Sequence, residues 1–131
     1  MTREELHNRL KQFTLRVFRL VGALPRNVVA NTIGGQVTRC SSSSAANYRA
    51  ACRSRSAAEF SARLGVVLEE LDESAFWLDL IIAAELLPKT RVALLLDEAN
   101  ELVAIFSRSY ATSRRNAKRP KASREGTADD A

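Results

Sequence analysis

The sequence predicts an all-α fold: a single left-handed up-down-up-down four-helix bundle followed by a disordered C-terminal tail. Two observations carry this prediction. Four segments repeat apolar residues at spacings of three and four, which is the period of an amphipathic helix. Proline and glycine mark the short connections between them, and short connections place successive helices antiparallel. We assign residues 1–112 to the bundle and residues 113–131, which lack apolar periodicity, to a disordered basic tail.

The first two helices follow from capping and spacing. Thr2 and Glu5 form a capping box, so a helix is expected to begin at once and to end near Gly22 and Pro25. Its core stripe is Leu6, Leu10, Phe13, Val17, Leu20 and Leu24. A second helix is expected over residues 27–53, with a stripe of mostly small residues that lets neighbouring backbones approach closely. This stripe is Ile33, Val37, Cys40, Ser44, Asn47, Tyr48 and Ala51.

The last two helices show longer apolar stripes. Ser56 and Glu59 form another capping box and start the third helix, which Pro88 closes. Its stripe is Phe60, Leu64, Val67, Leu68, Leu71, Ala75, Leu78 and Ile82. Thr90 is expected to cap the fourth helix. The core stripe of that helix is Val92, Leu95, Leu96, Ala99, Leu102, Val103 and Phe106.

The third helix is also apolar on the side away from its core stripe. One four-helix bundle cannot bury both sides of a helix, so a partner subunit is expected to cover the second side. Leu15 and Phe18 form a smaller second apolar face on the first helix, and Glu69 and Glu73 repel each other unless basic groups face them. The sequence therefore predicts a homo-oligomer. Its interface residues are Leu15, Phe18, Phe76, Trp77, Leu80, Leu87, Glu69 and Glu73.

Charge is segregated along the chain. Residues 1–55 carry a net charge of +8, residues 56–87 carry −6, and the tail carries +3, within a total of +5. Seven arginines are candidates for neutralising nucleic-acid phosphates, which adds salt-dependent affinity without sequence preference. They are Arg16, Arg19, Arg26, Arg39, Arg49, Arg53 and Arg55. The alternative is that these arginines pair with the acidic third helix, within or between subunits, in a purely structural scaffold.

The sequence contains no recognisable catalytic or metal-binding pattern. His7 is the single histidine and has no acid at a defined spacing, and the run Ser41–Ser44 lacks a nucleophile elbow. The acidic run of residues 69–73 lacks the Glu-x-x-His pairs of a di-iron bundle. We therefore expect neither an enzyme nor a cofactor. No apolar run reaches the roughly 18 residues of a membrane span, and the start lacks a signal peptide's apolar centre, so a cytoplasmic location is expected.

Several motifs resemble the bacterial four helix bundle protein family, which is named for open reading frames in intervening sequences of large-subunit ribosomal RNA genes. The motifs are residues 46–56 (ANYRAACRSRS), Glu59-Phe60, residues 68–74 (LEELDES), residues 76–78 (FWL), Leu24-Pro25, and Gln36 followed by Arg39. The resemblance covers about residues 10–110. Two positions depart from the family pattern, because Gly35 stands where a larger, often basic residue is usual and Ala50 where glutamate is common.

The resemblance also implies how the protein assembles and which partners it has. It implies an up-down bundle that assembles into a ring of five, with a basic channel or surface and no enzymatic activity. A family relative, the accessory variability determinant of diversity-generating retroelements, works beside a reverse transcriptase and binds nucleic acid. RNA or DNA, further copies of the chain, and a protein such as a reverse transcriptase are therefore the expected partners, without a membrane.

Overall fold

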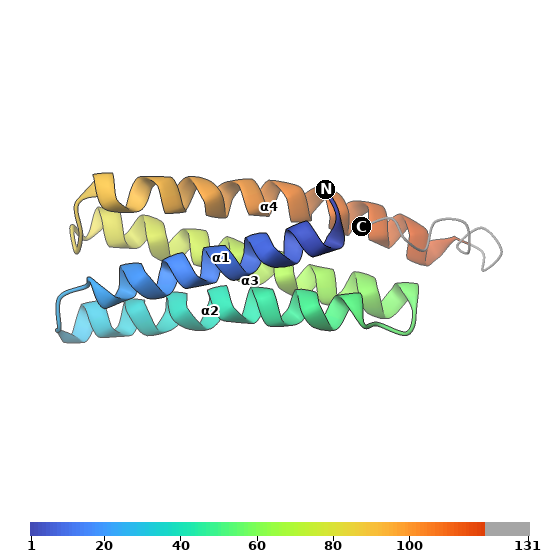
Figure 1. The fold of residues 1–131 in the computed structure, drawn as a ribbon, viewed down its shortest axis with the longest axis horizontal. Helices are drawn as coiled ribbons and strands as arrows, with labels where there is room; N and C mark the ends of the chain where they lie inside the picture. Colours follow the sequence, from blue (N-terminus) through green and yellow to red (C-terminus); the bar gives the residue numbers. More distant parts are fainter. Residues whose placement is uncertain (120–131) are drawn as a thin grey trace.

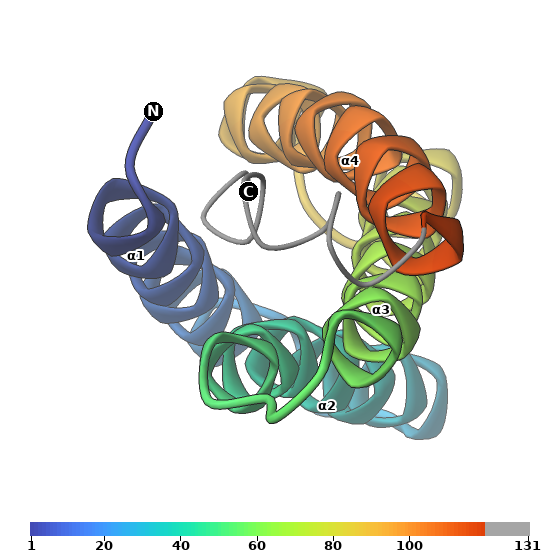
Figure 2. The same ribbon diagram turned by 90° about the vertical axis from the view of Figure 1, so that its right-hand side faces the viewer.

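A computed structural model describes residues 1–119, in which four helices follow one another with short turns between them. They are α1 (Arg3–Gly22), α2 (Val28–Cys52), α3 (Ala57–Ala83) and α4 (Lys89–Lys118). Each helix runs antiparallel to the one before it (Figure 1). In the end-on view of Figure 2, α1 and α3 lie at opposite corners of the bundle, with α2 and α4 at the other two. The structure confirms the predicted all-α four-helix bundle.

The starts of α1 and α2 are capped by side chains. The backbone N–H of Glu5 donates to Thr2 Oγ1 over 3.0 Å, and the backbone N–H of Thr2 donates to Glu5 Oε2 over 3.1 Å. This reciprocal pair confirms the predicted capping box. Asn27 caps α2 by accepting a hydrogen bond from the backbone N–H of Ala30 over 2.9 Å. Both helices therefore begin within a residue of the predicted positions.

The starts of α3 and α4 differ in part from the prediction. Ser56 caps α3 by accepting from the backbone N–H of Glu59 over 3.0 Å. Glu59 instead accepts from the backbone N–H of Arg55 over 3.3 Å, so only half of the predicted box forms. Pro88 occupies the cap position of α4 and makes no side-chain cap hydrogen bond, so the predicted capping role of Thr90 is wrong. Proline fits this position because its fixed φ suits a helix start.

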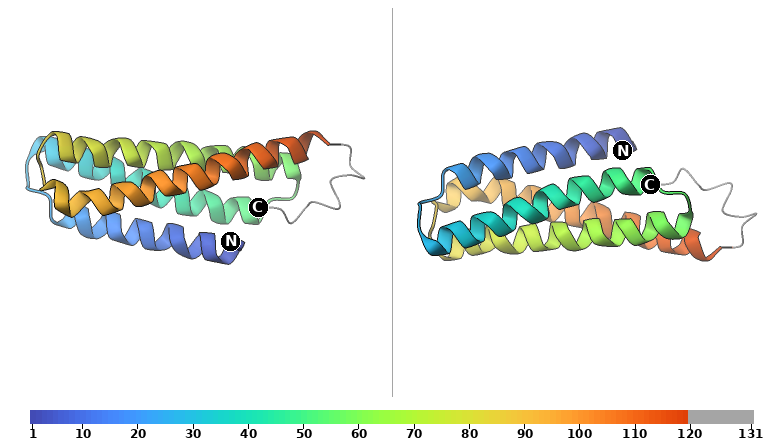
Figure 3. Two further views of the ribbon diagram at one scale, coloured as in Figure 1. Left: turned by 90° about the horizontal axis from the view of Figure 1, so that it is seen from above. Right: turned by 90° about the horizontal axis from the view of Figure 1, so that it is seen from below.

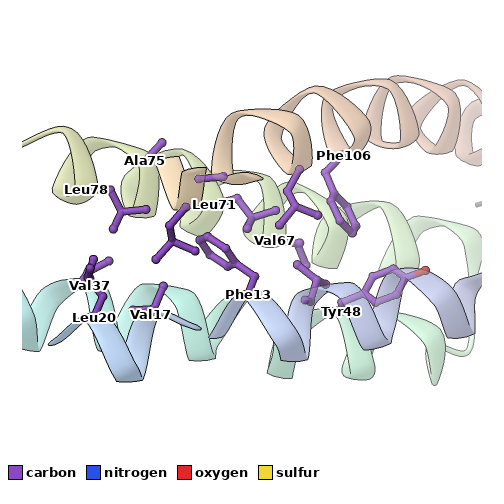
Figure 4. Close-up of a cluster of buried hydrophobic side chains, with 14 of the residues drawn as sticks. Phe13, Val17, Leu20, Val37, Tyr48, Val67, Leu71, Ala75, Leu78 and Phe106 are labelled. Carbon is purple, nitrogen blue, oxygen red and sulfur yellow. The ribbon is translucent and has the colours of Figure 1, made fainter. Parts of the chain in front are cut away.

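The four apolar stripes meet in one core (Figure 4). Phe13 from α1, Leu71 and Leu78 from α3, and Phe106 from α4 are all fully buried. Burying a side chain of this size stabilises the fold by roughly 1.5–3 kcal/mol. Tyr48 from α2 packs edge-on against Phe106, with 5.2 Å between the ring centroids. Burial raises the pKa of the Tyr48 hydroxyl, which stays protonated inside the core.

An ion-pair cluster joins α1 to α4, the adjacent pair of helices with the smallest mutual contact. Arg9 Nε donates to Glu98 Oε2 over 2.8 Å, and Arg9 Nη2 donates to Glu98 Oε1 over 2.7 Å. The same Nη2 also reaches Glu101 Oε2 at 2.8 Å. These hydrogen bonds from Arg9 lower the pKa of Glu98, because they favour its charged form. Arg9 therefore links α1 directly to two glutamates of α4.

The positions at which α3 and α4 end correct two predictions. α3 ends at Ala83, and Glu85 takes a left-handed conformation with φ 55°. The chain then turns inward, so Leu87 is buried in its own protomer and is not available for the predicted interface. α4 continues to Lys118, beyond the predicted bundle boundary at residue 112. The rest of the predicted tail, residues 120–131, lies outside the described residues.

Two adjacent glycines of α2 differ in their surroundings, and this gives a matched prediction. A Cβ added at Gly35 meets nothing within 4 Å, whereas one at Gly34 comes within 3.1 Å of Val21 Cγ1 and 3.2 Å of Leu24 Cδ1. Gly35→Ala is expected to raise the free energy of unfolding by about 1 kcal/mol through helix propensity. Gly34→Ala gains the same propensity but must displace the side chains of Val21 and Leu24, so it is expected to stabilise less or to destabilise. Urea titration of the two variants measures the difference, and equal effects would contradict this prediction.

Candidate nucleic-acid interface

Six of the seven predicted phosphate-binding arginines separate into two groups, which lie toward opposite ends of the bundle. Arg49 lies in the last turn of α2, and Arg53 and Arg55 lie in the turn that leads to α3. The other group lies on the second half of α1 and in the α1–α2 turn: Arg16, Arg19 and Arg26. These two turns are at opposite ends of the molecule (Figure 1). The sequence-predicted residues therefore do not form one continuous surface.

The last turns of α4 add basic residues to the end that carries the α2–α3 turn (Figure 3). Ser113 Oγ donates to Ser61 Oγ over 3.0 Å, and both side chains are buried, so the end of α4 lies against the start of α3. This contact carries Arg114, Arg115 and Lys118 to the same end as Arg53 and Arg55. Residues far apart in the sequence thus converge on one basic surface.

We call this surface the basic end. It consists of Arg49, Arg53, Arg55, Arg63, Arg114, Arg115 and Lys118. All seven side chains are exposed, and none of them forms an ion pair with any residue in the range 1–119. The segments around them, residues 3–5, 49–63 and 108–119, contain ten Lys or Arg against three acidic residues. An excess of this size creates a positive potential that attracts polyanions.

Arg39 does not belong to the basic end, because it forms ion pairs with α3. Its guanidinium bonds to Glu70 Oε2 over 3.2 Å and to Glu73 Oε2 on α3. Trp77 Nε1 donates to the same Glu73 oxygen over 3.0 Å. For Arg39, the alternative interpretation of pairing with the third helix therefore holds, and it holds inside one protomer. Glu73 and Trp77, both predicted for the oligomer interface, belong to this internal network.

Sequence reasoning missed four members of the basic end, Arg63, Arg114, Arg115 and Lys118. The last three were assigned to the tail because residues 113–131 lack apolar periodicity. A weaker signal was present, since Phe106, Tyr110 and Ser113 keep the four-and-three spacing of the α4 core stripe. In the structure Tyr110 packs across Gly65, where an added Cβ would lie 3.1 Å from its ring.

The predicted oligomer-interface residues also divide into two sets. Trp77 and Leu80 are half-buried and pack on the core of their own protomer, as Leu87 does more completely. The second apolar side of α3 is therefore largely covered within one protomer, because α2 and α4 flank this helix. The second set remains exposed: Leu15, Phe18, Glu69 and Phe76.

None of the four helices in the described part of the chain has the length and apolarity that a membrane span needs.

Comparisons with known proteins agree with this architecture. The chain is similar to the crystal structure of a protein of unknown function from the S23 ribosomal protein family of Bacteroides thetaiotaomicron. The two share 23% sequence identity with a TM-score of 0.69, over 77% of this chain and 94% of that chain, which supports the fold. A comparison with curated proteins finds no match. The sequence profile of the 23S rRNA-intervening sequence protein family matches residues 4–108, and the chain therefore belongs to that family.

Proposed function

We propose that this protein is a non-catalytic, self-assembling four-helix bundle that binds RNA or DNA at its basic end. The observation that carries the proposal is the convergence of exposed arginines without ion-pair partners among residues 1–119, from the α2–α3 turn and from the end of α4. A guanidinium binds phosphate bidentately and stays charged at every physiological pH. Several such groups on one surface fit a phosphate backbone, with affinity that depends little on base sequence.

Neutralising part of the basic end tests this proposal. A variant with Arg53, Arg55, Arg114 and Arg115 replaced by alanine is expected to bind a 20-base-pair duplex more weakly at every salt concentration. Each lost phosphate contact is expected to reduce the slope of log affinity against log salt by roughly 1, so the slope falls by about 3–4. Fluorescence anisotropy with labelled DNA and RNA duplexes of the same sequence, titrated at several salt concentrations, measures both quantities.

A charge-matched control uses the opposite end of the bundle. Arg26, Lys89 and Arg91 lie there, and Arg16 lies on the half of α1 that leads to that end. Replacing these four residues with alanine removes as many positive charges as the first variant does. This variant is expected to keep most of the affinity and nearly the whole salt slope. Equal losses in the two variants would show that net charge alone attracts the duplex. Binding that is unchanged in the first variant would refute the assignment to the basic end.

A further inference from the structure

The outward surface of α1 is basic and apolar. No acidic residue occurs between Leu6 and Arg26. Lys11, Leu15, Phe18 and Arg19 recur at spacings that place them on one side of the helix, away from its core stripe. Leu15 and Phe18 are each 42% exposed, and Lys11 and Arg19 are exposed on either side of them. We call these four residues the α1 outer face.

The outward surface of α3 has the opposite charge. No Lys or Arg occurs between Leu64 and Pro88. Glu69, Asp72, Phe76 and Asp79 lie on one side of the helix and are all exposed, and Phe76 is 56% exposed. Phe76 therefore stands as an apolar centre between carboxylates, as Leu15 and Phe18 stand between basic groups on α1. We call these four residues the α3 outer face.

The two faces cannot meet inside one protomer. α1 and α3 lie at opposite corners of the bundle, so their outer faces point in opposite directions (Figure 2). The neighbouring charges are already used internally, since Arg9 binds Glu98 and Glu101 and Arg39 binds Glu70 and Glu73. Within residues 1–119, the charged members of both outer faces make no ion pair.

The two faces lie at the same height along the bundle. Thr14 Oγ1 donates to the Ser41 carbonyl over 3.1 Å, and Ser74 Oγ donates to Cys40 Sγ over 3.1 Å, so residues 14 and 74 are level through α2. α1 and α3 also run in the same direction (Figure 1). Counting from these levels, Phe18 and Leu15 lie at the height of Phe76.

The charges match along the axis as well. Lys11 and Arg19 are separated by about 12 Å along α1, at a rise of 1.5 Å per residue. Asp72 and Asp79 are separated by roughly 10.5 Å along α3 by the same rule. With Leu15 and Phe18 opposite Phe76, Lys11 comes to the height of Asp72 and Arg19 to the height of Asp79.

We propose that the α1 outer face of one copy docks on the α3 outer face of a second copy, with the two helices parallel and in register. This inference rests on the self-assembly in the proposed function and specifies its geometry. The contact pairs two different surfaces, so a docked pair of copies keeps one free α1 outer face and one free α3 outer face, and further copies add in the same sense. Oppositely charged faces also disfavour α1–α1 and α3–α3 contacts, because like charges would then oppose each other.

Charge reversal on the two faces tests this geometry. Lys11→Glu with Arg19→Glu makes the α1 outer face acidic, and Asp72→Lys with Asp79→Lys makes the α3 outer face basic. Each double variant is expected to shift from the wild-type mass to that of a monomer in light scattering at about 20 μM, because its two faces then repel. All four side chains are exposed, and circular dichroism checks that the helices are retained.

The quadruple variant that combines both reversals is the decisive measurement. It has the net charge of the wild type and two complementary faces again, so its mass is expected to return to the wild-type value. Double variants that keep the wild-type mass, or a quadruple variant that stays monomeric, would overturn the docking geometry while leaving self-assembly standing. A monomeric wild type would overturn self-assembly itself, and the duplex titrations test nucleic-acid binding independently of either result.

Discussion

Replacing Leu71 with alanine is expected to lower the free energy of unfolding by about 2–5 kcal/mol. Leu71 lies at the centre of α3 with 0% of its surface exposed, and it belongs to the cluster that all four helices line (Figure 4). Truncation removes buried methyl groups and leaves a cavity that long, closely packed helices fill only in part. Urea denaturation followed by circular dichroism measures the loss.

Leu94→Ala is the matched control for this variant. It makes the same chemical change in the same type of element, but Leu94 on α4 is 73% exposed. Its effect is expected to stay within about 0.5 kcal/mol. Both variants and the wild type must be compared at one protein concentration, because the proposed self-assembly would raise the apparent stability with concentration. Equal losses at Leu71 and Leu94 would show that the core does not lie where the structure places it.

Arg9→Met is expected to destabilise the fold by roughly 1–3 kcal/mol, because it leaves a carboxylate in a poorly hydrated position without its cation. The side chain of Glu98 is only 15% exposed and accepts two hydrogen bonds from Arg9. Methionine retains much of the apolar stem of arginine, so the change isolates the guanidinium. Arg26→Met makes the same substitution at an exposed position that has no ion pair with residues 1–119, and it is expected to be nearly neutral.

The Arg9–Glu98 ion pair also predicts that the free energy of unfolding depends on pH. Arg9 lowers the pKa of Glu98 below its ordinary value of 4.5, so the unfolded state binds the proton more readily than the folded state. The ion pair therefore stabilises fully above pH 4.5, and its contribution is lost as the pH falls through the folded pKa. Urea titrations from pH 7 down to pH 3 should show the wild type and Arg9→Met converging in acid. A difference that stays constant with pH would contradict the ion-pair explanation.

Much of the fold follows from local chemistry that the sequence displays. The Thr2–Glu5 box and the Ser56 cap form because each supplies an oxygen to backbone N–H groups that no helical carbonyl can reach. The core positions were predictable because spacings of three and four residues place side chains on one side of any α-helix. These rules depend on a few neighbouring residues, and they failed only for the predicted Thr90 cap and for half of the Ser56–Glu59 box.

Two of the predictions that were wrong concern places where distant residues meet. Leu87 was assigned to an interface because it continues the apolar second side of α3, but Glu85 breaks the helix and returns the chain to the core. Arg114 and Arg115 were assigned to a tail because their own segment is polar. In the structure that segment continues α4, and the buried Ser113–Ser61 contact packs it against α3, which lies far from it in the sequence.

The sequence by itself therefore determined four helices, their order and their buried sides, since helical periodicity and capping are local properties. The tertiary structure alone decided which arginines form ion pairs within the protomer and which stay exposed for a ligand. Antiparallel packing places Arg39 beside Glu70 and Glu73 and neutralises it, while the end of α4 joins Arg53 and Arg55 at one end of the bundle. Ion pairing and surface potential depend on distances in space, and helices far apart in the chain set those distances only once they have packed.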